Sequence, residues 1–316
     1  MKNIAIIGLG YHLPKRVLTN ADLERLVDTS DEWITSRTGI KERRIADKHE
    51  KNSDLAIHAA KNALKNAKLD PHKVELIIVA TISPDSNFPA VSCLVQKAIG
   101  AHKAAAFDIS AACSGFLYAM TTAKQFLQTG LYANALVIAS EKITSLVDWT
   151  DRSTCVLFGD GAGACVLAPT TSKTRGIIAD YILAHGEFGK LMEVVVDSMH
   201  TPRIVMQGQE LFKIAVNSMA DAVQKAVKKA GLKLSDVDCV VPHQANDRII
   251  SAVAKKLHIP KDKIFVNIYK YGNMSAASIA VALCEAVEQE RIKKGDTVVL
   301  VTFGAGLVSA ANVVKW

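Results

Sequence analysis

The chain has 316 residues, 49% hydrophobic and 22% charged, which allows a large buried core and argues against a disordered protein. The formal net charge of +7 is spread along the chain, so a basic patch for an acidic partner or a phosphate-bearing ligand is favoured over a nucleic-acid-binding arm. The short apolar run 3–8 predicts a strand rather than a secretory signal, and no apolar stretch reaches the length of a membrane-spanning helix. The six scattered cysteines form no CxxC pair, so we expect neither a disulfide framework nor a zinc site, and a cytoplasmic location.

Strand-like and helix-like segments alternate along the chain, and the pattern occurs twice with an offset of about 160 residues. This alternation predicts an α/β fold with βαβ units, in which the sheets are mostly parallel and buried on both faces. We place the boundary near 169–176, which gives an N-terminal half of 1–170 and a C-terminal half of 171–316. In chain order, the first half predicts strands at 74–80, 104–109 and 135–139, with a helix at 114–129, and closes on a glycine-rich turn and a further strand within 158–166. The second half predicts strands at 237–241, 264–268 and 297–301, with a helix at 274–290, and closes on a glycine-rich turn and a further strand within 303–309.

Sites in α/β sheets form beyond the carboxyl ends of strands, and Cys113 is the first reactive residue at such a position. It lies between an expected strand and the helix at 114–129, where the helix dipole and free N–H groups favour the thiolate, the nucleophilic form. Its neighbours Ala111, Ala112, Ser114 and Gly115 are small and let a substrate approach. A buried structural cysteine is the alternative interpretation.

His243 and Asn273 occupy matching positions in the second half. His243 follows the strand 237–241 and is either functional or an ordinary core histidine. Asn273 precedes the last helix, where it can serve as an N-cap, but the repeat also places it opposite Cys113 across one cleft. The glycine-rich segments 158–163 and 303–306 lack phosphate-binding patterns and predict tight turns, the second of which can lend a backbone N–H to an oxyanion hole.

Taken together, these motifs resemble those of the β-ketoacyl-acyl carrier protein synthase III family, the initiating condensing enzymes of bacterial fatty-acid synthesis. The resemblance spans essentially the whole chain, and asparagine at 273 matches the initiating class, since elongating enzymes use a second histidine. It implies a thiolase-like fold, with two pseudo-repeated mixed α/β halves in a layered αβαβα arrangement. The motifs that carry it are Asp31–Ile34, Arg37–Ile40, Ala80–Asp85, Ala111–Phe116, Phe158–Gly163, His243–Asn246, Gly272–Asn273 and Phe303–Gly306.

The resemblance implies that Cys113 takes an acyl group from acyl-CoA and that His243 and Asn273 hydrogen-bond the thioester oxygen of malonyl-acyl carrier protein as it decarboxylates. The backbone N–H groups of Cys113 and Ala305 would form the oxyanion hole for the acyl group. Neither a cofactor nor a metal is implied, since acyl-CoA is a substrate, and a homodimer is expected. The family pattern also assigns CoA binding to Trp33, Arg37, Arg152, Phe212 and Asn246, carrier-protein binding to Lys213, Arg248, Lys255 and Lys256, and the partner's acyl pocket to Phe88.

The chain departs from the family pattern at Met274, at Asp247, at 307–309 and in the short segment 186–208, so the acyl length is left open. One alternative function is an acyltransferase of secondary metabolism that uses the same cysteine and histidine without condensation. Another is a non-catalytic CoA-binding or assembly protein. Asn273 argues against the first, and the complete set of Cys113, His243 and Asn273 argues against the second.

Overall fold

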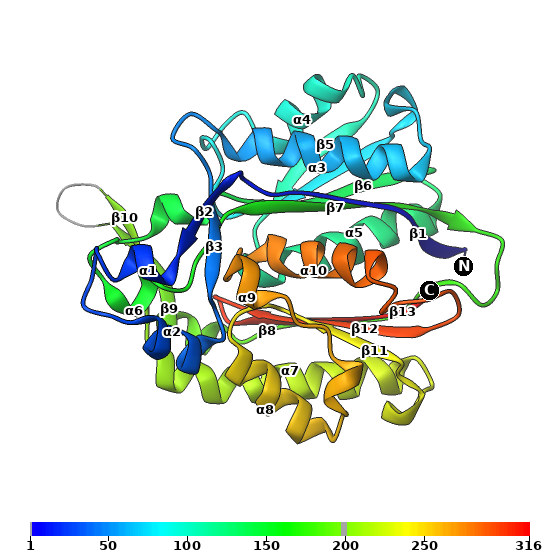
Figure 1. The fold of residues 1–316 in the computed structure, drawn as a ribbon. Helices are drawn as coiled ribbons and strands as arrows, with labels where there is room; N and C mark the ends of the chain where they lie inside the picture. Colours follow the sequence, from blue (N-terminus) through cyan, green and yellow to red (C-terminus); the bar gives the residue numbers. More distant parts are fainter. Residues whose placement is uncertain (1, 197–200) are drawn as a thin grey trace.

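The computed structural model describes residues 2–196 and 201–316, and its core contains two mixed β-sheets (Figure 1). The first sheet has the strand order β1-β7-β6-β4-β5, and the second has the order β11-β12-β13-β8. In each sheet a parallel pair is followed by two antiparallel neighbours, so the second sheet repeats the first apart from β5. The strands are β1 (Asn3–His12), β4 (Leu76–Ala80), β5 (Ala105–Ile109), β6 (Ala135–Glu141), β7 (Gly161–Thr170), β8 (Gly176–Ala184), β11 (Cys239–Pro242), β12 (Thr297–Gly304) and β13 (Val308–Lys315).

Two details of the predicted strands are wrong. The sheets are mixed rather than mostly parallel, because strands such as β12 and β13 follow each other through a short turn, which can join only antiparallel neighbours. The segment 264–268 forms a single bridge between Ile264 and Val240 in place of a strand, and helix α9 (Ile268–Tyr271) begins where that strand was expected to end. The division of the chain into two folding units at residue 170 stays a prediction.

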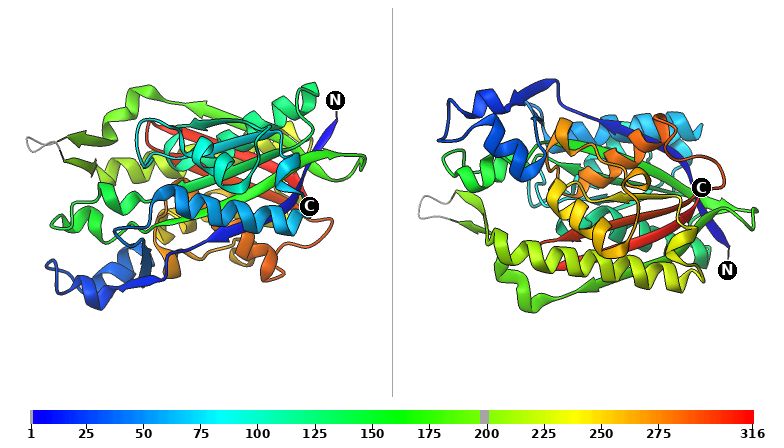
Figure 2. Two further views of the ribbon diagram at one scale, coloured as in Figure 1. Left: turned by 90° about the horizontal axis from the view of Figure 1, so that it is seen from above. Right: turned by 60° about the horizontal axis from the view of Figure 1, so that its bottom comes forward.

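Five layers follow from how the helices cover the sheets, as the thiolase-like fold predicts (Figures 1 and 2). Helices α5 and α10 lie next to each other between the sheets. The residues of α10 from Ala276 to Ala286 are all buried, which suits a helix packed on every side. Helices α3 and α4 cover the outer face of the first sheet, and α7 and α8 cover that of the second. The bounds are Asn52–Ala67 (α3), Val91–Ile99 (α4), Gly115–Thr129 (α5), Gly208–Lys229 (α7), Asp247–Leu257 (α8) and Ala276–Glu288 (α10).

A group of short elements gathers at one end of the layers, at the left of Figure 1. This is the end at which β4, β6 and β11 finish, so the group surrounds the edge where sites form in α/β sheets. Within the described ranges, no helix has both the length and the apolar character needed to cross a bilayer. The short elements are β2 (Arg16–Thr19), α1 (Asn20–Leu23), α2 (Asp31–Thr38), β3 (Glu42–Ile45), α6 (Arg152–Cys155), β9 (Met192–Val196) and β10 (Pro202–Met206).

Candidate active site

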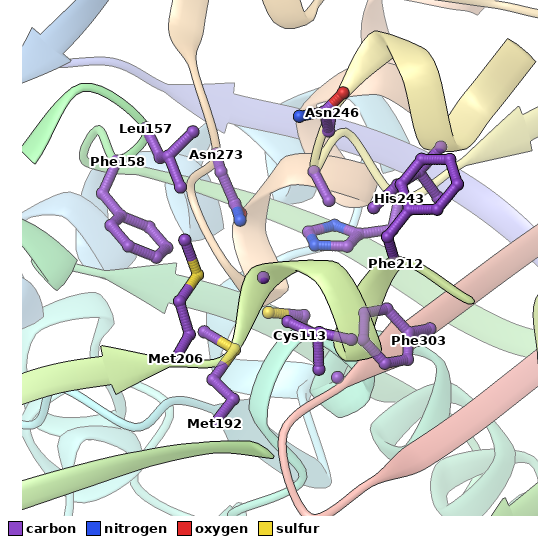
Figure 3. Close-up of a pocket in the computed structure, with 15 residues that line it drawn as sticks. Cys113, Leu157, Phe158, Met192, Met206, Phe212, His243, Asn246, Asn273 and Phe303 are labelled. Carbon is purple, nitrogen blue, oxygen red and sulfur yellow. The ribbon is translucent and has the colours of Figure 1, made fainter. Parts of the chain in front are cut away.

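The structure brings Cys113, His243 and Asn273 together on the wall of one cavity of about 120 Å³ (Figure 3). Cys113 comes from the turn after β5, His243 directly follows β11, and Asn273 follows α9. The three side chains therefore come from both halves of the repeat and meet where the carboxyl ends of the strands converge. A thiol, an imidazole and an amide facing one space can supply a nucleophile and two hydrogen-bonding groups.

Cys113 lies in the 3-10 turn Ala112–Ser114, directly ahead of α5. Its side chain is 4% exposed, and burial raises the pKa of the thiol to about 12. A helix N-terminus stabilises a negative charge by about 1 kcal/mol at most in ordinary surface settings, which is too little to offset the desolvation of a buried thiolate. Burial therefore opposes the thiolate that the position at the helix start favours.

His243 is fixed by its backbone and surrounded by protein. Its N–H donates to the carbonyl of Val301 at 2.7 Å, and the side chain is buried. Burial lowers the pKa of the imidazole to about 3, so the ring is neutral at physiological pH. Its Nδ1 atom makes no hydrogen bond within residues 2–196 and 201–316. A neutral ring can donate a hydrogen bond from one nitrogen to a ligand in the cavity.

Asn273 is not the N-cap that its position before the last helix suggests, because α10 begins at Ala276 and Ser275 is the N-cap. Instead, Asn273 Oδ1 accepts a hydrogen bond from the backbone N–H of Ser275 at 2.9 Å. This bond orients the amide, so that its Nδ2 group points into the cavity (Figure 3). Hydrogen bonds to Leu157 O and from Gly159 N hold the main chain of Asn273 on both sides.

The glycine-rich turn after β12 packs directly against the backbone of Cys113. A Cβ atom added to Gly304 would lie 2.8 Å from Cys113 N and 3.1 Å from Ser114 N, so glycine is required for this close approach. Ala305 follows, and it lines a second cavity together with Cys113. The two backbone groups expected to form an oxyanion hole therefore border the same space.

The second cavity has a volume of about 50 Å³ and is also lined by Cys113. Its walls are mostly apolar, and Met192 and Phe158 border both cavities. The hairpin of β9 and β10, which belongs to the short segment 186–208, supplies part of these walls. Residues 197–200 of that segment lie outside the described residues. The lining side chains of the second cavity include Ile82, Ile143, Val194 and Ile204.

At the expected CoA-binding positions, Trp33 is flanked by two arginines. The guanidinium carbon of Arg152 is 5.0 Å from the centre of the indole ring, and that of Arg37 is 5.6 Å away. Phe212 and Asn246 line the larger cavity. Asn246 is also the N-cap of α8, since its Oδ1 accepts from Arg248 N at 2.8 Å.

Two other groups of predicted residues lie outside the cavities. Lys213, Arg248, Lys255 and Lys256 are exposed on the neighbouring helices α7 and α8, and Arg248 lies 6.0 Å over the ring of Phe212. Phe88 is 85% exposed and borders neither cavity of its own chain. The structure of one chain therefore keeps Phe88 apart from Cys113.

Three of the departures from the family pattern, at Met274, Asp247 and Leu307, line neither cavity. Met274 is buried, and its sulfur packs where a Cβ on Gly161 would lie, so it fills the core. Asp247 lies in the first turn of α8, where a carboxylate suits the helix dipole, and its Cβ packs against Gly39. Leu307 is buried in the core of the second half.

Sequence reasoning missed several residues at the site. Met192 and Met206 line the larger cavity, Ser275 lines the smaller one, and Glu141 is buried at the end of β6 close enough to raise the pKa of Cys113. Glu141 offered one usable signal, because it is a charged residue that ends an apolar strand. The methionines offered none, because a hairpin reaches the site only through tertiary packing.

Comparisons with known proteins give a consistent assignment. The family model of 3-oxoacyl-[acyl-carrier-protein (ACP)] synthase III matches residues 107–186, and the model of its C-terminal part matches residues 227–316. The chain is 51% identical to beta-ketoacyl-[acyl-carrier-protein] synthase III of Caldanaerobacter subterraneus subsp. tengcongensis, over 98% of this chain and 97% of that protein. The crystal structure of 3-oxoacyl-[acyl-carrier-protein] synthase III from Aquifex aeolicus superposes with a TM-score of 0.95 at 51% identity, covering 99% of this chain and 100% of that chain. The corresponding enzyme from Thermus thermophilus gives 0.94 at 43% identity, with 99% of each chain covered. The chain therefore belongs to the β-ketoacyl-[acyl-carrier-protein] synthase III family of condensing acyltransferases.

Proposed function

We propose that this protein condenses a short acyl group, delivered by acyl-CoA, with the malonyl group of malonyl-acyl carrier protein and so starts fatty-acid chains. The observation that carries the proposal is the orientation of Asn273. Its Oδ1 is held by Ser275, so its Nδ2 group faces the cavity that Cys113 and His243 share. A fixed donor in that place stabilises the negative oxygen of an enolate.

The first half-reaction loads the acyl group onto Cys113. The sulfur attacks the carbonyl carbon of acyl-CoA, and the backbone N–H groups of Cys113 and Ala305 donate to the oxygen as it becomes negative. The bond from carbon to the CoA sulfur then breaks, and CoA leaves as a thiol after taking up a proton. The acyl group remains on Cys113 as a thioester, so the kinetics are ping-pong and no cofactor is needed.

The second half-reaction forms the carbon–carbon bond. Malonyl-carrier protein loses its carboxylate as carbon dioxide, and the electron pair moves into the thioester carbonyl to form an enolate. His243 and Asn273 donate hydrogen bonds to the enolate oxygen. The enolate carbon attacks the thioester on Cys113, which releases the 3-ketoacyl product and the cysteine sulfur. Simple acyl transfer to a hydroxyl forms no enolate, so it does not need the hydrogen bond that Asn273 donates.

The smaller cavity beside Cys113 supports a short acyl substrate. On the same measure, one water molecule needs about 10–15 Å³, so a space of about 50 Å³ holds roughly three to five such volumes. Its apolar walls, which include Ile82, Ile143 and Ile204, suit a hydrocarbon chain of a few carbon atoms.

A panel of acyl-CoA substrates assayed with malonyl-acyl carrier protein tests the proposed function. We expect acetyl- and propionyl-CoA to give 3-ketoacyl products with kcat/KM at least about tenfold above octanoyl-CoA, since each misfitted methylene costs about 1–3 kcal/mol of discrimination. Release of carbon dioxide should match product formation one to one. Acyl transfer to the carrier protein without carbon dioxide release would contradict condensation and favour the rival acyltransferase.

Trp33 and Arg152 support CoA binding because an aromatic base can stack between them. In the free protein the gap between the two side chains is too narrow for such a base. A flat base stacked between them needs about 7 Å, twice a carbon–carbon contact distance, whereas the pair is 5.0 Å apart. Arg152 must therefore swing outward, giving up the bond from its Nη1 to the carbonyl of Asp28 at 2.7 Å. Arg37 lies beside the same ring, and Phe212 and Asn246 line the larger cavity for the rest of the CoA arm.

The exposed cations of α7 and α8 support docking of the acidic carrier protein. We expect the double change Lys213→Ala and Arg248→Ala to raise KM for malonyl-carrier protein by about tenfold, because rim charges steer association. KM for acetyl-CoA should stay within about threefold in steady-state assays. The matched control is Lys61→Ala with Lys65→Ala, two exposed cations on α3, which should change neither constant. The proposal fails if both double variants behave alike. Lys255 and Lys256 extend the same surface.

A second copy of the chain and a cytoplasmic location complete the proposal. β5 is the edge strand of the first sheet, and all five of its residues are only partly buried, which favours pairing with another strand. Phe88 is free to reach into the acyl pocket of that partner. Light scattering that gives only the 34.0 kDa mass of one chain would contradict the dimer.

The six free cysteines fit a reducing cytoplasm, which fractionation of the source cells can test.

A further inference from the structure

A buried carboxylate lies at the end of β6 near Cys113, and the reaction outlined above does not use it. Glu141 is fully buried. Its Oε1 atom makes no hydrogen bond within residues 2–196 and 201–316, which is unusual for a buried carboxylate oxygen. Its Oε2 atom accepts from the loop after β4, namely from Ser83 Oγ at 2.6 Å, Ile82 N at 3.1 Å and Thr81 Oγ1 at 3.2 Å.

Ser275 lines the smaller cavity together with Cys113 and with Ile82, whose N–H donates to the Glu141 carboxylate. Its hydroxyl lowers the pKa of both the Cys113 thiol and the Glu141 carboxyl, although its oxygen makes no hydrogen bond to the described part of the chain. Ser275 has a φ of 48°, a strained value for a residue other than glycine, and its N–H is held by Asn273 Oδ1 at 2.9 Å. Strain of this kind collects at functional sites, and Ser275 lines the same cavity as Cys113.

The packing around Gly115 explains how these groups meet. A Cβ atom on Gly115, the first residue of α5, would lie 3.0 Å from Ala80 Cβ and 3.4 Å from Ala276 Cβ. Ala80 ends β4 just before the loop that binds Glu141, and Ala276 follows Ser275. The start of α5 is therefore wedged between the two segments, and Cys113 sits at their junction.

We propose that Glu141 receives the Cys113 thiol proton through the Ser275 hydroxyl when the acyl group is loaded, and returns it when condensation releases the sulfur. The inference rests on the proposed function and adds the group, Glu141, that holds the thiol proton of Cys113 between the two half-reactions. Glu141 acts on the sulfur through Ser275, so it is a positioning residue for the proton and not a group that touches the substrate.

The protons and bonds balance over one turnover. In loading, the S–H bond of Cys113 breaks, the proton of Ser275 passes to Glu141 as Ser275 takes the thiol proton, and the sulfur–acyl bond forms. The CoA thiolate that leaves takes its proton from solvent. In condensation, the sulfur–acyl bond breaks to give a thiolate, and neutral Glu141 returns the proton by the same route. One proton is consumed from solvent for each carbon dioxide released.

The protonation states support this route over one through His243. Burial raises the pKa of Glu141 to about 7 and lowers that of His243 to about 3, so Glu141 is the better proton acceptor near neutral pH. Keeping the proton away from His243 leaves the ring neutral, and the enolate step needs it as a hydrogen-bond donor. The charge of Glu141 also raises the pKa of Cys113, as expected for two acids that share one proton.

The other charged groups near Glu141 are already engaged. Lys142 turns its Nζ to the carbonyls of Asp47 and Glu50 at 2.8 and 2.6 Å. Asp160, which is also buried, is bonded to Thr144. The loop after β4 offers hydroxyl and N–H donors to Glu141, and its carboxylate Asp85 accepts from Ser53 N. Cys113 is a titratable group on which the charge of Glu141 acts, because that charge raises its pKa.

Single-turnover acylation of Cys113 by acetyl-CoA, followed from pH 5.5 to 9, tests the proposal on the full chain. For the natural protein we expect the rate to rise with an apparent pKa near 7, because the ionised carboxylate accepts the proton. Glu141→Gln keeps the shape but cannot take a proton, so it should slow acylation by about 10²-fold and remove this rise. KM for acetyl-CoA should stay within about twofold. Glu141→Asp should restore part of the rate with a shifted profile.

Ser275→Ala provides a second variant with the same expected loss, and Ser140→Ala is its matched control. Ser140 is an equally buried serine next to Glu141, but its hydroxyl binds Asn52. Acylation of Glu141→Gln and Ser275→Ala with the natural pH profile would overturn the proposal, as would an equal loss in Ser140→Ala. If the natural protein neither loads acetyl groups nor condenses them, the proposed function itself fails.

Thermal unfolding separates this role from a structural one. A raised pKa in the folded state means that stability is fully present below the unfolded value near 4.5 and is lost as pH rises through about 7. Glu141→Gln should therefore unfold at a higher temperature than the natural protein at pH 8, while it acylates more slowly. A variant that is both less stable and slower would point to a damaged fold and would count against the proton route.

Discussion

Cys113→Ala should abolish acyl loading and reduce the rate of condensation by about 10⁴-fold or more, because removal of a catalytic nucleophile typically lowers kcat by that factor. The sulfur is the atom that forms the thioester, and no other thiol lines either cavity in the described part of the chain. His243 and Asn273 stay in place, so decarboxylation of malonyl-carrier protein should continue without producing a 3-ketoacyl chain. Intact-mass spectrometry after incubation with acetyl-CoA measures the adduct directly.

The exposed Cys93 supplies the control for this experiment. Cys93→Ala should retain one acetyl group per chain and full condensation, because Cys93 lies in α4 on the outer face of the first sheet. An acetyl group that persists in Cys113→Ala, or that maps to Cys93, would remove Cys113 from the nucleophile role.

Much of the fold follows from local patterns in the chain. The alternation of apolar strands with helices at a repeated spacing predicts the two sheets and the layers, since burial of both sheet faces demands helices on each side. The direction of each strand is not a local property, so the antiparallel returns of β7 and β13 were not predicted. The apolar segment 264–268 has the pattern of a strand, yet it forms an isolated bridge to Val240 of β11 in place of a ladder.

The site divides in a similar way. Cys113 and His243 stand at strand ends, where chemistry is expected, and the repeat places Asn273 opposite them. Their protonation states could not be predicted, because burial by distant segments outweighs the dipole of the adjacent helix. The Glu141 carboxylate accepts hydrogen bonds from hydroxyls about 60 residues earlier in the chain, and this contact exists only in the folded sheet. Local sequence thus finds the reactive groups, and packing decides which of them holds a proton.

Asn273→Ala should reduce malonyl decarboxylation by about 10² to 10³-fold and should reduce acyl loading of Cys113 far less. One donor to a developing oxyanion contributes about 2.7–4 kcal/mol in a site that excludes water, and Asn273 donates only to the enolate. Loading uses the backbone N–H groups of Cys113 and Ala305, which this change leaves in place, so loading is affected only through the lost hydrogen bond from Ser275 N. Carbon dioxide release and single-turnover acetylation measure the two half-reactions separately.

Asn273→Asp distinguishes loss of the donor from loss of shape. An aspartate keeps an oxygen to accept from Ser275 N, but it offers an oxygen to the cavity in place of the Nδ2 group. It should therefore be at least as slow in decarboxylation as the alanine variant, since a negative charge beside an enolate repels it. Equal losses in both half-reactions, in either variant, would mean that Asn273 organises the cavity as a whole. Loss confined to decarboxylation would mean that the amide nitrogen stabilises the enolate, which is the step that separates condensation from simple acyl transfer.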